Sequence, residues 1–161
     1  MRKFVCGIGL LLLLSGCSGR PTFEEMQTHF EENRATFSMI AALACDSGEE
    51  SGTDEIAITS DSSVNQTLLA LADTMNIENI IYRQADGRCA LTMRIYEDEY
   101  ATGYEQFAYR YNVPDPAPYN PITHNYDTAV EKIEQGAIDE IDFDMKLAKR
   151  WYFSFSYKDI G

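Results

Sequence analysis

Residues 79–96 read NIIYRQADGRCALTMRIY, and this stretch decides the fold class. Asp86-Gly87 lies at its centre and is typical of the two-residue turn that joins antiparallel strands. After the turn, apolar side chains occupy every second position: Cys89, Leu91, Met93 and Ile95. Because successive side chains of a strand point to opposite faces, the pattern predicts a β-hairpin with one buried face.

Alternation of the same kind returns along the chain. The further predicted strands are residues 55–59, 107–111, 141–147 and 151–157. A looser turn is expected at residues 97–99, before the strand at 107–111, and a polar turn at Lys149-Arg150. Four prolines within residues 113–121 predict a stiff extended loop, because proline fixes φ and lacks an N–H donor.

The N-terminal part has helical periodicity instead. Residues 22–25 (Thr-Phe-Glu-Glu) form a capping box, in which the Thr22 hydroxyl and the Glu25 carboxylate each accept a backbone hydrogen bond. Apolar residues then recur at steps of three and four: Phe23, Met26, Phe30, Phe37, Ile40 and Ala44. This predicts one long amphipathic helix over residues 23–45, followed by an exposed acidic loop over residues 46–54.

Two shorter helices complete the predicted elements. A second capping box at residues 63–66 begins a helix that ends near Asn76, and residues 126–135 form another before Gly136. Helices followed mainly by strands are the order of an α+β domain, with helices on one face of an antiparallel sheet. We therefore expect a single α+β domain over residues 22–161.

The first 17 residues carry a targeting pattern. Arg2-Lys3 precede an apolar run over residues 4–14, which is shorter than the roughly 20 residues of a membrane-spanning helix. Leu14-Ser15-Gly16-Cys17 follows, and it resembles the lipobox of bacterial lipoproteins. The resemblance implies that residues 1–16 are a cleaved signal peptide. It also implies that Cys17 carries a diacylglycerol thioether and an N-acyl chain such as palmitate, and several acyl chains hold a protein stably on a bilayer. The alternative is an uncleaved N-terminal anchor.

The resemblance also indicates a location. Ser18, and not Asp, follows Cys17, which in enterobacteria-like lipoproteins usually means export to the outer membrane. Residues 17–21 would then be a short lipidated tether. The expected location is the cell envelope, on the outer membrane and facing the periplasm.

Charge excludes several classes of partner. The chain has 13 Lys and Arg against 26 Asp and Glu, a net charge of −13, which becomes −15 when Arg2 and Lys3 leave with the signal. Such a surface does not suit nucleic acid, which is bound through basic patches, or electrostatic docking on anionic lipid head groups. It attracts basic partners.

The cysteines indicate one disulfide. Cys6 leaves with the predicted signal and Cys17 is the predicted lipidation site, so Cys45 and Cys89 remain in an oxidising compartment. An even remainder of two predicts a Cys45–Cys89 bond. Two free thiols or a redox pair are the alternative, but the Cys-x-x-Cys spacing of thioredoxin-like sites is absent.

Catalytic motifs are absent from the sequence. It contains no Gly-x-Ser-x-Gly, Ser-x-x-Lys or His-Glu-x-x-His, so we expect no cofactor, no metal and no enzymatic activity. His29 is expected at the boundary of a helix face. His124, near Tyr126 and Asp127, is either a solvated loop histidine or a general base. Asp142 and Asp144 share one strand face, and alternation favours a solvated face over a glycosidase-like carboxylate pair.

The tyrosines suggest an interaction surface. All ten lie from Tyr82 onward, and tyrosine buries a large area while keeping a polar group, which suits binding surfaces. The predicted partner-binding residues, within an acidic region at 96–126, are Tyr96, Glu97, Glu99, Tyr100, Tyr104 and Glu105. We therefore expect a non-enzymatic, protein-binding envelope lipoprotein, similar in profile to inhibitors or immunity proteins, with a basic partner. One alternative is a structural accessory subunit of an envelope assembly; another is an enzyme that uses His124 with nearby carboxylates.

Overall fold

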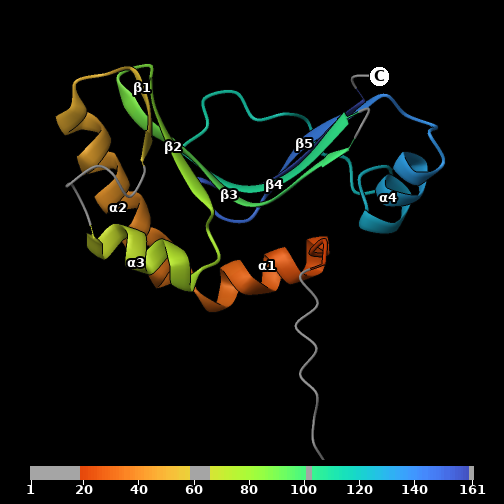
Figure 1. The fold of residues 1–161 in the computed structure, drawn as a ribbon, viewed down its shortest axis with the longest axis horizontal. Helices are drawn as coiled ribbons and strands as arrows, with labels where there is room; N and C mark the ends of the chain where they lie inside the picture. Colours follow the sequence, from red (N-terminus) through yellow and green to blue (C-terminus); the bar gives the residue numbers. More distant parts are fainter. Residues whose placement is uncertain (1–18, 59–65, 101–102, 160–161) are drawn as a thin grey trace, which may run out of the picture.

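The predicted hairpin lies within a six-stranded antiparallel sheet in the computed structural model, which describes residues 19–58, 66–100 and 103–159 (Figure 1). The strands are β1 (Glu55–Ile58), β2 (Asn79–Ala85), β3 (Arg88–Tyr100), β4 (Gly103–Tyr111), β5 (Glu140–Lys146) and β6 (Trp151–Asp159). Their order in the sheet is β1-β2-β3-β4-β6-β5, and every neighbouring pair is antiparallel. Asp86 and Gly87 both have positive φ, as the predicted turn requires.

The predicted turn at residues 97–99 is wrong, because β3 continues to Tyr100 and pairs with β4 along this stretch. The register shifts between Arg94 and Tyr96, so that Tyr96 opposes Phe107. An extra residue at such a bulge reverses the alternation of side chains between the two faces. β3 is therefore continuous through Tyr100, although the alternation of its side chains reverses after the bulge.

Four helices are described: α1 (Phe23–Glu32), α2 (Arg34–Ser51), α3 (Gln66–Thr74) and α4 (Tyr126–Glu134). The fold is α+β as expected, but the predicted single helix over residues 23–45 is divided at Asn33. The Asn33 side chain donates to the backbone oxygen of His29 at 2.8 Å. Asparagine side chains that bond to nearby backbone groups compete with the helical hydrogen bonds in this way.

The predicted loop at 46–54 is also largely wrong, because α2 continues through Ser51. Gly48 lies against the ring of Tyr82, so closely that an added Cβ would overlap the ring. The polar, Gly-containing stretch is therefore helical because its inner side packs on β2. Gly52 ends the helix with φ 67°. The capping box predicted at residues 63–66 begins outside the described residues, as do the predicted signal and Cys17.

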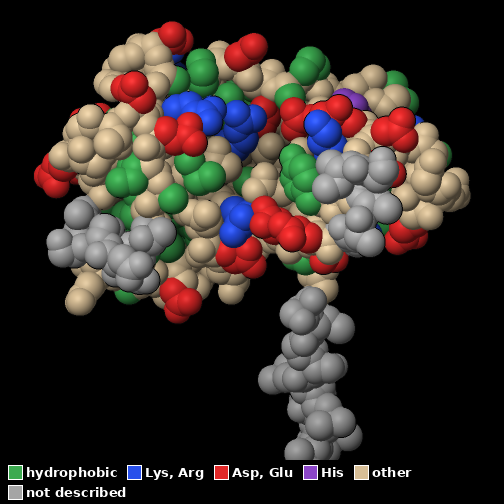
Figure 2. Space-filling view, turned by 45° about the horizontal axis from the view of Figure 1, so that its top comes forward, with side chains coloured by type: hydrophobic (Ala, Val, Ile, Leu, Met, Phe, Trp, Pro, Cys, Tyr) green, Lys and Arg blue, Asp and Glu red, His purple; other side chains and the backbone are tan. Residues whose placement is uncertain are grey.

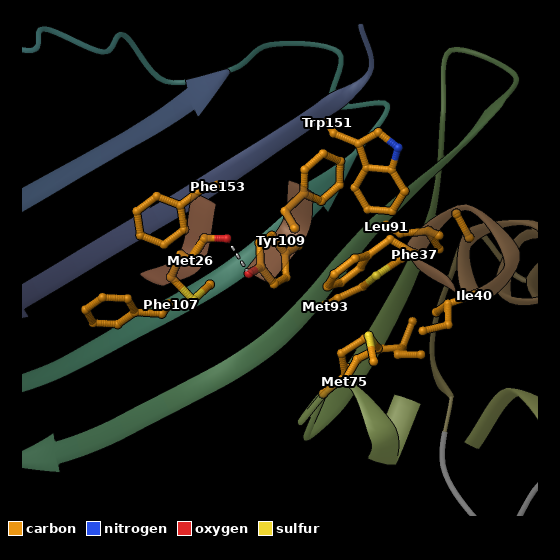
Figure 3. Packing of buried hydrophobic residues seen from close by; sticks show 14 of the residues in the cluster. Met26, Phe37, Ile40, Met75, Leu91, Met93, Phe107, Tyr109, Trp151 and Phe153 are labelled. Carbon is orange, nitrogen blue, oxygen red and sulfur yellow. Dashed lines mark hydrogen bonds between the residues drawn. The ribbon is translucent and has the colours of Figure 1, made fainter. Parts of the chain in front are cut away.

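The core lies between one face of the sheet and the helices α1, α2 and α3 (Figures 1 and 3). Its largest fully buried side chains include Phe30, Phe37, Tyr82, Phe107, Tyr109, Phe143, Phe153 and Phe155. The hydroxyl of Tyr109 donates to the backbone oxygen of Met26 at 2.7 Å, which joins β4 to α1 (Figure 3). The predicted disulfide between Cys45 of α2 and Cys89 of β3 is confirmed.

Candidate interaction surface

The loop that connects β4 to α4, residues 112–125, passes along the outer edge of β5; we call it the wrapping loop. In Figure 1 it first lies on the side of the sheet opposite α1 and α3 and then reaches α4. Ala117 forms two hydrogen bonds with Asp144 of β5. Its oxygen accepts from the Asp144 N–H at 3.1 Å, and its N–H donates to the Asp144 carboxylate at 2.7 Å. The loop therefore covers part of a sheet edge that would otherwise be open for pairing.

Asp144 is the fastening point of the wrapping loop. Its predicted solvated position is wrong, because the residue is only 3% exposed. Arg110 of β4 reaches across β6 and donates to the Asp144 carboxylate at 2.7 Å. Asp142 on the same strand is exposed as predicted, and partial burial together with the charge of Asp144 raises the pKa of its carboxyl.

The tip of the wrapping loop presents apolar side chains to solvent. Ile122 is 81% exposed and Tyr119 is 36% exposed. Met39 on α2, at 52%, is the other large hydrophobic side chain that is exposed among residues 19–58, 66–99 and 103–159. Exposed apolar side chains that are close together in one loop make that loop a candidate interaction site. We call residues 118–124 the contact loop.

Hydrogen bonds hold the contact loop in one conformation. The backbone oxygen of Asn120 accepts from the backbone N–H groups of Thr123 and His124, at 3.2 and 2.8 Å. The Asn120 side chain accepts from the Ile122 N–H at 2.9 Å, and the Nδ1 atom of His124 accepts from the Asn120 N–H at 3.1 Å. With Pro118 and Pro121 also fixing φ, Ile122 is presented at low conformational-entropy cost.

His124, the last residue of the contact loop, packs against β5. Its ring stacks on Phe143 with centroids 4.7 Å apart and an interplanar angle of 11°. Burial, and then the charge of Lys132, lower the pKa of His124, which favours the neutral ring that the Nδ1 hydrogen bond requires. No carboxylate among the residues that the structure describes forms an ion pair with His124, and this includes Asp127.

The predicted partner-binding residues do not form one surface. Strand alternation places Glu97, Glu99 and Tyr104 on the face opposite the helices, whereas Tyr96 and Glu105 lie on the helix face. Glu97 forms an ion pair with Arg94 at 2.7 Å. The side chain of Tyr100 lies outside what the structure describes. The predicted partner-binding residues are therefore distributed over both faces of the sheet.

Glu105 is a correction to the predicted surface. It is fully buried on β4 and pairs with Arg20, so it is not part of an exposed acidic patch. Tyr96 is half-buried and packs edge-on against Phe107, with its hydroxyl donating to Asp98 at 3.4 Å. Ile122, by contrast, was missed from the sequence. Its signal is an isolated aliphatic residue directly after Asn120-Pro121, outside any alternating or helical pattern.

A cavity of about 410 Å³ lies between α2 and the turn that joins β5 to β6. Its lining includes Ala42, Tyr111, Lys149, Arg150 and Trp151.

The described residues contain no group of three or more His, Cys, Asp or Glu side chains placed to hold a metal ion.

Acidification is expected to destabilise the protein through its two histidines. Burial lowers the pKa of both His29 and His124 in the folded state. At pH values between the lowered pKa of the folded state and the ordinary histidine pKa of about 6.5, the unfolded chain binds more protons than the folded chain. The free energy of unfolding therefore falls as pH falls through this range. Urea unfolding from about pH 8 to about pH 5.5 measures the slope. The double variant His29→Gln/His124→Gln should flatten it, and an unchanged slope would contradict this assignment.

The comparisons with known proteins give no family for this chain. None of the described helices is long and apolar enough to cross a membrane. No protein-family model, curated protein or solved structure matches the sequence or the fold.

Proposed function

We propose that this protein is a non-enzymatic, lipid-anchored binding module of the cell envelope, which binds a partner protein through the contact loop. The observation that carries the proposal is Ile122, 81% exposed at the tip of a loop whose backbone is fixed by hydrogen bonds. Binding energy in protein interfaces is concentrated in a few side chains that enter pockets of the partner. A fixed apolar tip suits that role, because little entropy is lost on binding.

The charge around the contact loop supports a basic partner. Asp127 is exposed in the first turn of α4, directly after the wrapping loop, on a chain whose net charge is −13. Acidic residues beside an apolar contact favour a partner with basic residues around its pocket, and they raise the association rate. The location on the envelope is supported by Leu14-Ser15-Gly16-Cys17 alone.

Replacing Ile122 with aspartate is expected to abolish partner binding. Burying an isoleucine side chain contributes about 2–3 kcal/mol, so its loss alone weakens binding by about 30- to 150-fold. The mature chain without lipid is immobilised, and proteins from envelope and secreted fractions are captured at low and high salt. Each captured protein is then quantified on the wild type and on the Ile122→Asp variant.

The matched control is Met39→Asp, which places the same charge at an exposed apolar position on α2. A protein retained by the wild type and by Met39→Asp, and lost from Ile122→Asp, supports the contact loop. Release of that protein by salt supports a basic partner, and retention at high salt supports the accessory-subunit alternative. Equal capture by Ile122→Asp and the wild type would refute the contact loop as the site.

A further inference from the structure

Arg20 fastens the N-terminal segment to the sheet. One guanidinium nitrogen lies 2.8 Å from the carboxylate of Glu105 on β4, and another lies 3.7 Å from that of Glu134 on α4. The Arg20 side chain is 19% exposed, and the Glu105 side chain is 0% exposed. Two residues later, Thr22 caps α1. The chain is therefore held in place from Arg20 onward.

The Arg20–Glu105 pair is a strong fastening. A buried carboxylate without a cation is costly, so the folded domain favours the state in which Arg20 is docked. Exposed pairs contribute far less; one example here is Arg34 with Glu31 at 3.9 Å. Arg20 is thus held by the interior of the fold, although it lies in the segment that the sequence assigned to the tether.

The length of free tether follows from this docking. Only Ser18 and Gly19 separate Arg20 from Cys17, and three Cα–Cα steps of about 3.8 Å span at most about 11 Å. Resting on the lipid anchor proposed above, we propose that the Arg20–Glu105 ion pair fixes the domain at the bilayer surface. The end of the sheet that holds Glu105 then faces the lipid.

The opposite end of the sheet then faces away from the lipid. On β4, Glu105 is paired with Tyr157, and Tyr111, six residues further along, is paired with Trp151 beside the β5–β6 turn. Six residues of strand span about 20 Å. Acidic side chains near the docking point, Glu24 and Glu134, are exposed and repel anionic head groups. The acylated tether therefore makes the contact with the lipid, and the domain binds partners close to the membrane.

The test uses the acylated mature protein, which begins at Cys17, in phosphatidylcholine vesicles that contain nitroxide-labelled lipid. A fluorophore is attached at Glu24→Cys, near the docking point, or at Lys149→Cys, on the β5–β6 turn; both native side chains are exposed. We expect lipid quenching to be several-fold stronger at position 24 than at position 149. In the Arg20→Ala background this difference should disappear, whereas Arg34→Ala, which breaks an exposed pair, should leave it unchanged.

A second variant changes the length of the tether without removing the Arg20–Glu105 ion pair. A Gly/Ser insertion between Gly19 and Arg20 that doubles the tether leaves the ion pair in place, and it should also reduce the difference in quenching. Mass spectrometry of Cys17 distinguishes the two proposals. An unmodified Cys17 overturns the lipid anchor, and an acylated Cys17 with equal quenching at both positions overturns the fixed orientation.

Discussion

Replacing both Cys45 and Cys89 with alanine is expected to lower the free energy of unfolding by about 4 kcal/mol. The bond joins residues 44 positions apart in the sequence, so it removes much of the freedom of the unfolded chain. In the folded state it holds α2 against the first residues of β3. Urea unfolding of the oxidised protein and of the double variant measures the loss.

The reduced wild-type protein is the control, because it lacks the bond but keeps both cysteines. It should unfold at nearly the same urea concentration as the double variant. Hydrogen exchange should increase most at the C-terminal part of α2, whose polar residues pack on the sheet through Ser47 and Gly48. A loss of stability below about 1 kcal/mol would show that the unfolded chain is already constrained near these two residues.

Replacing Arg110 with alanine is expected to cost about 3–5 kcal/mol, because it leaves the Asp144 carboxylate buried without its cation. One carboxylate oxygen of Asp144 already has no hydrogen-bond partner among the described residues, and the other would keep only the Ala117 N–H. The wrapping loop should then detach from β5. Urea unfolding gives the stability, and faster hydrogen exchange at the Asp144 N–H reports the detachment.

The double variant Arg110→Ala/Asp144→Ala completes a mutant cycle. It should lose less stability than the sum of the two single variants, because it removes the unpaired buried charge. Arg83→Ala serves as the matched control, since its pair with Glu55 is exposed and contributes at most about 1 kcal/mol. Additive losses in the cycle would contradict the role of Asp144 as the fastening point.

Local patterns predicted much of the architecture. Alternation found the β2–β3 hairpin, β5 and β6, and Asp86-Gly87 placed the turn, since a strand with one buried face shows its period directly in the sequence. The capping box at Thr22 and the helix that ends before Gly136 were found because helix starts and stops are set by neighbouring residues. The disulfide was found because Cys45 and Cys89 are the two cysteines left after the predicted signal and lipidation site are set aside.

Other features depend on residues that are distant in the sequence. Residues 46–51 are helical because Gly48 fits against Tyr82, and no local signal contains that contact. Asp144 was predicted to be solvated because alternation assigns it to an outer face, and only the return of the wrapping loop buries it. Glu105 was assigned to an acidic, tyrosine-rich surface from its neighbours in the sequence, whereas in the fold it is buried and pairs with Arg20.

By itself the sequence determined the α+β class, the order of the strands along the chain, the disulfide and the acidic charge, because these follow from periodicity, turn chemistry and counting. The tertiary structure alone decided which carboxylates are buried, that Ile122 is exposed, and where Arg20 is held. Burial and pairing are set by segments that meet across the sheet, such as Arg20 with Glu105 and Arg110 with Asp144, and one-dimensional patterns carry no record of those contacts.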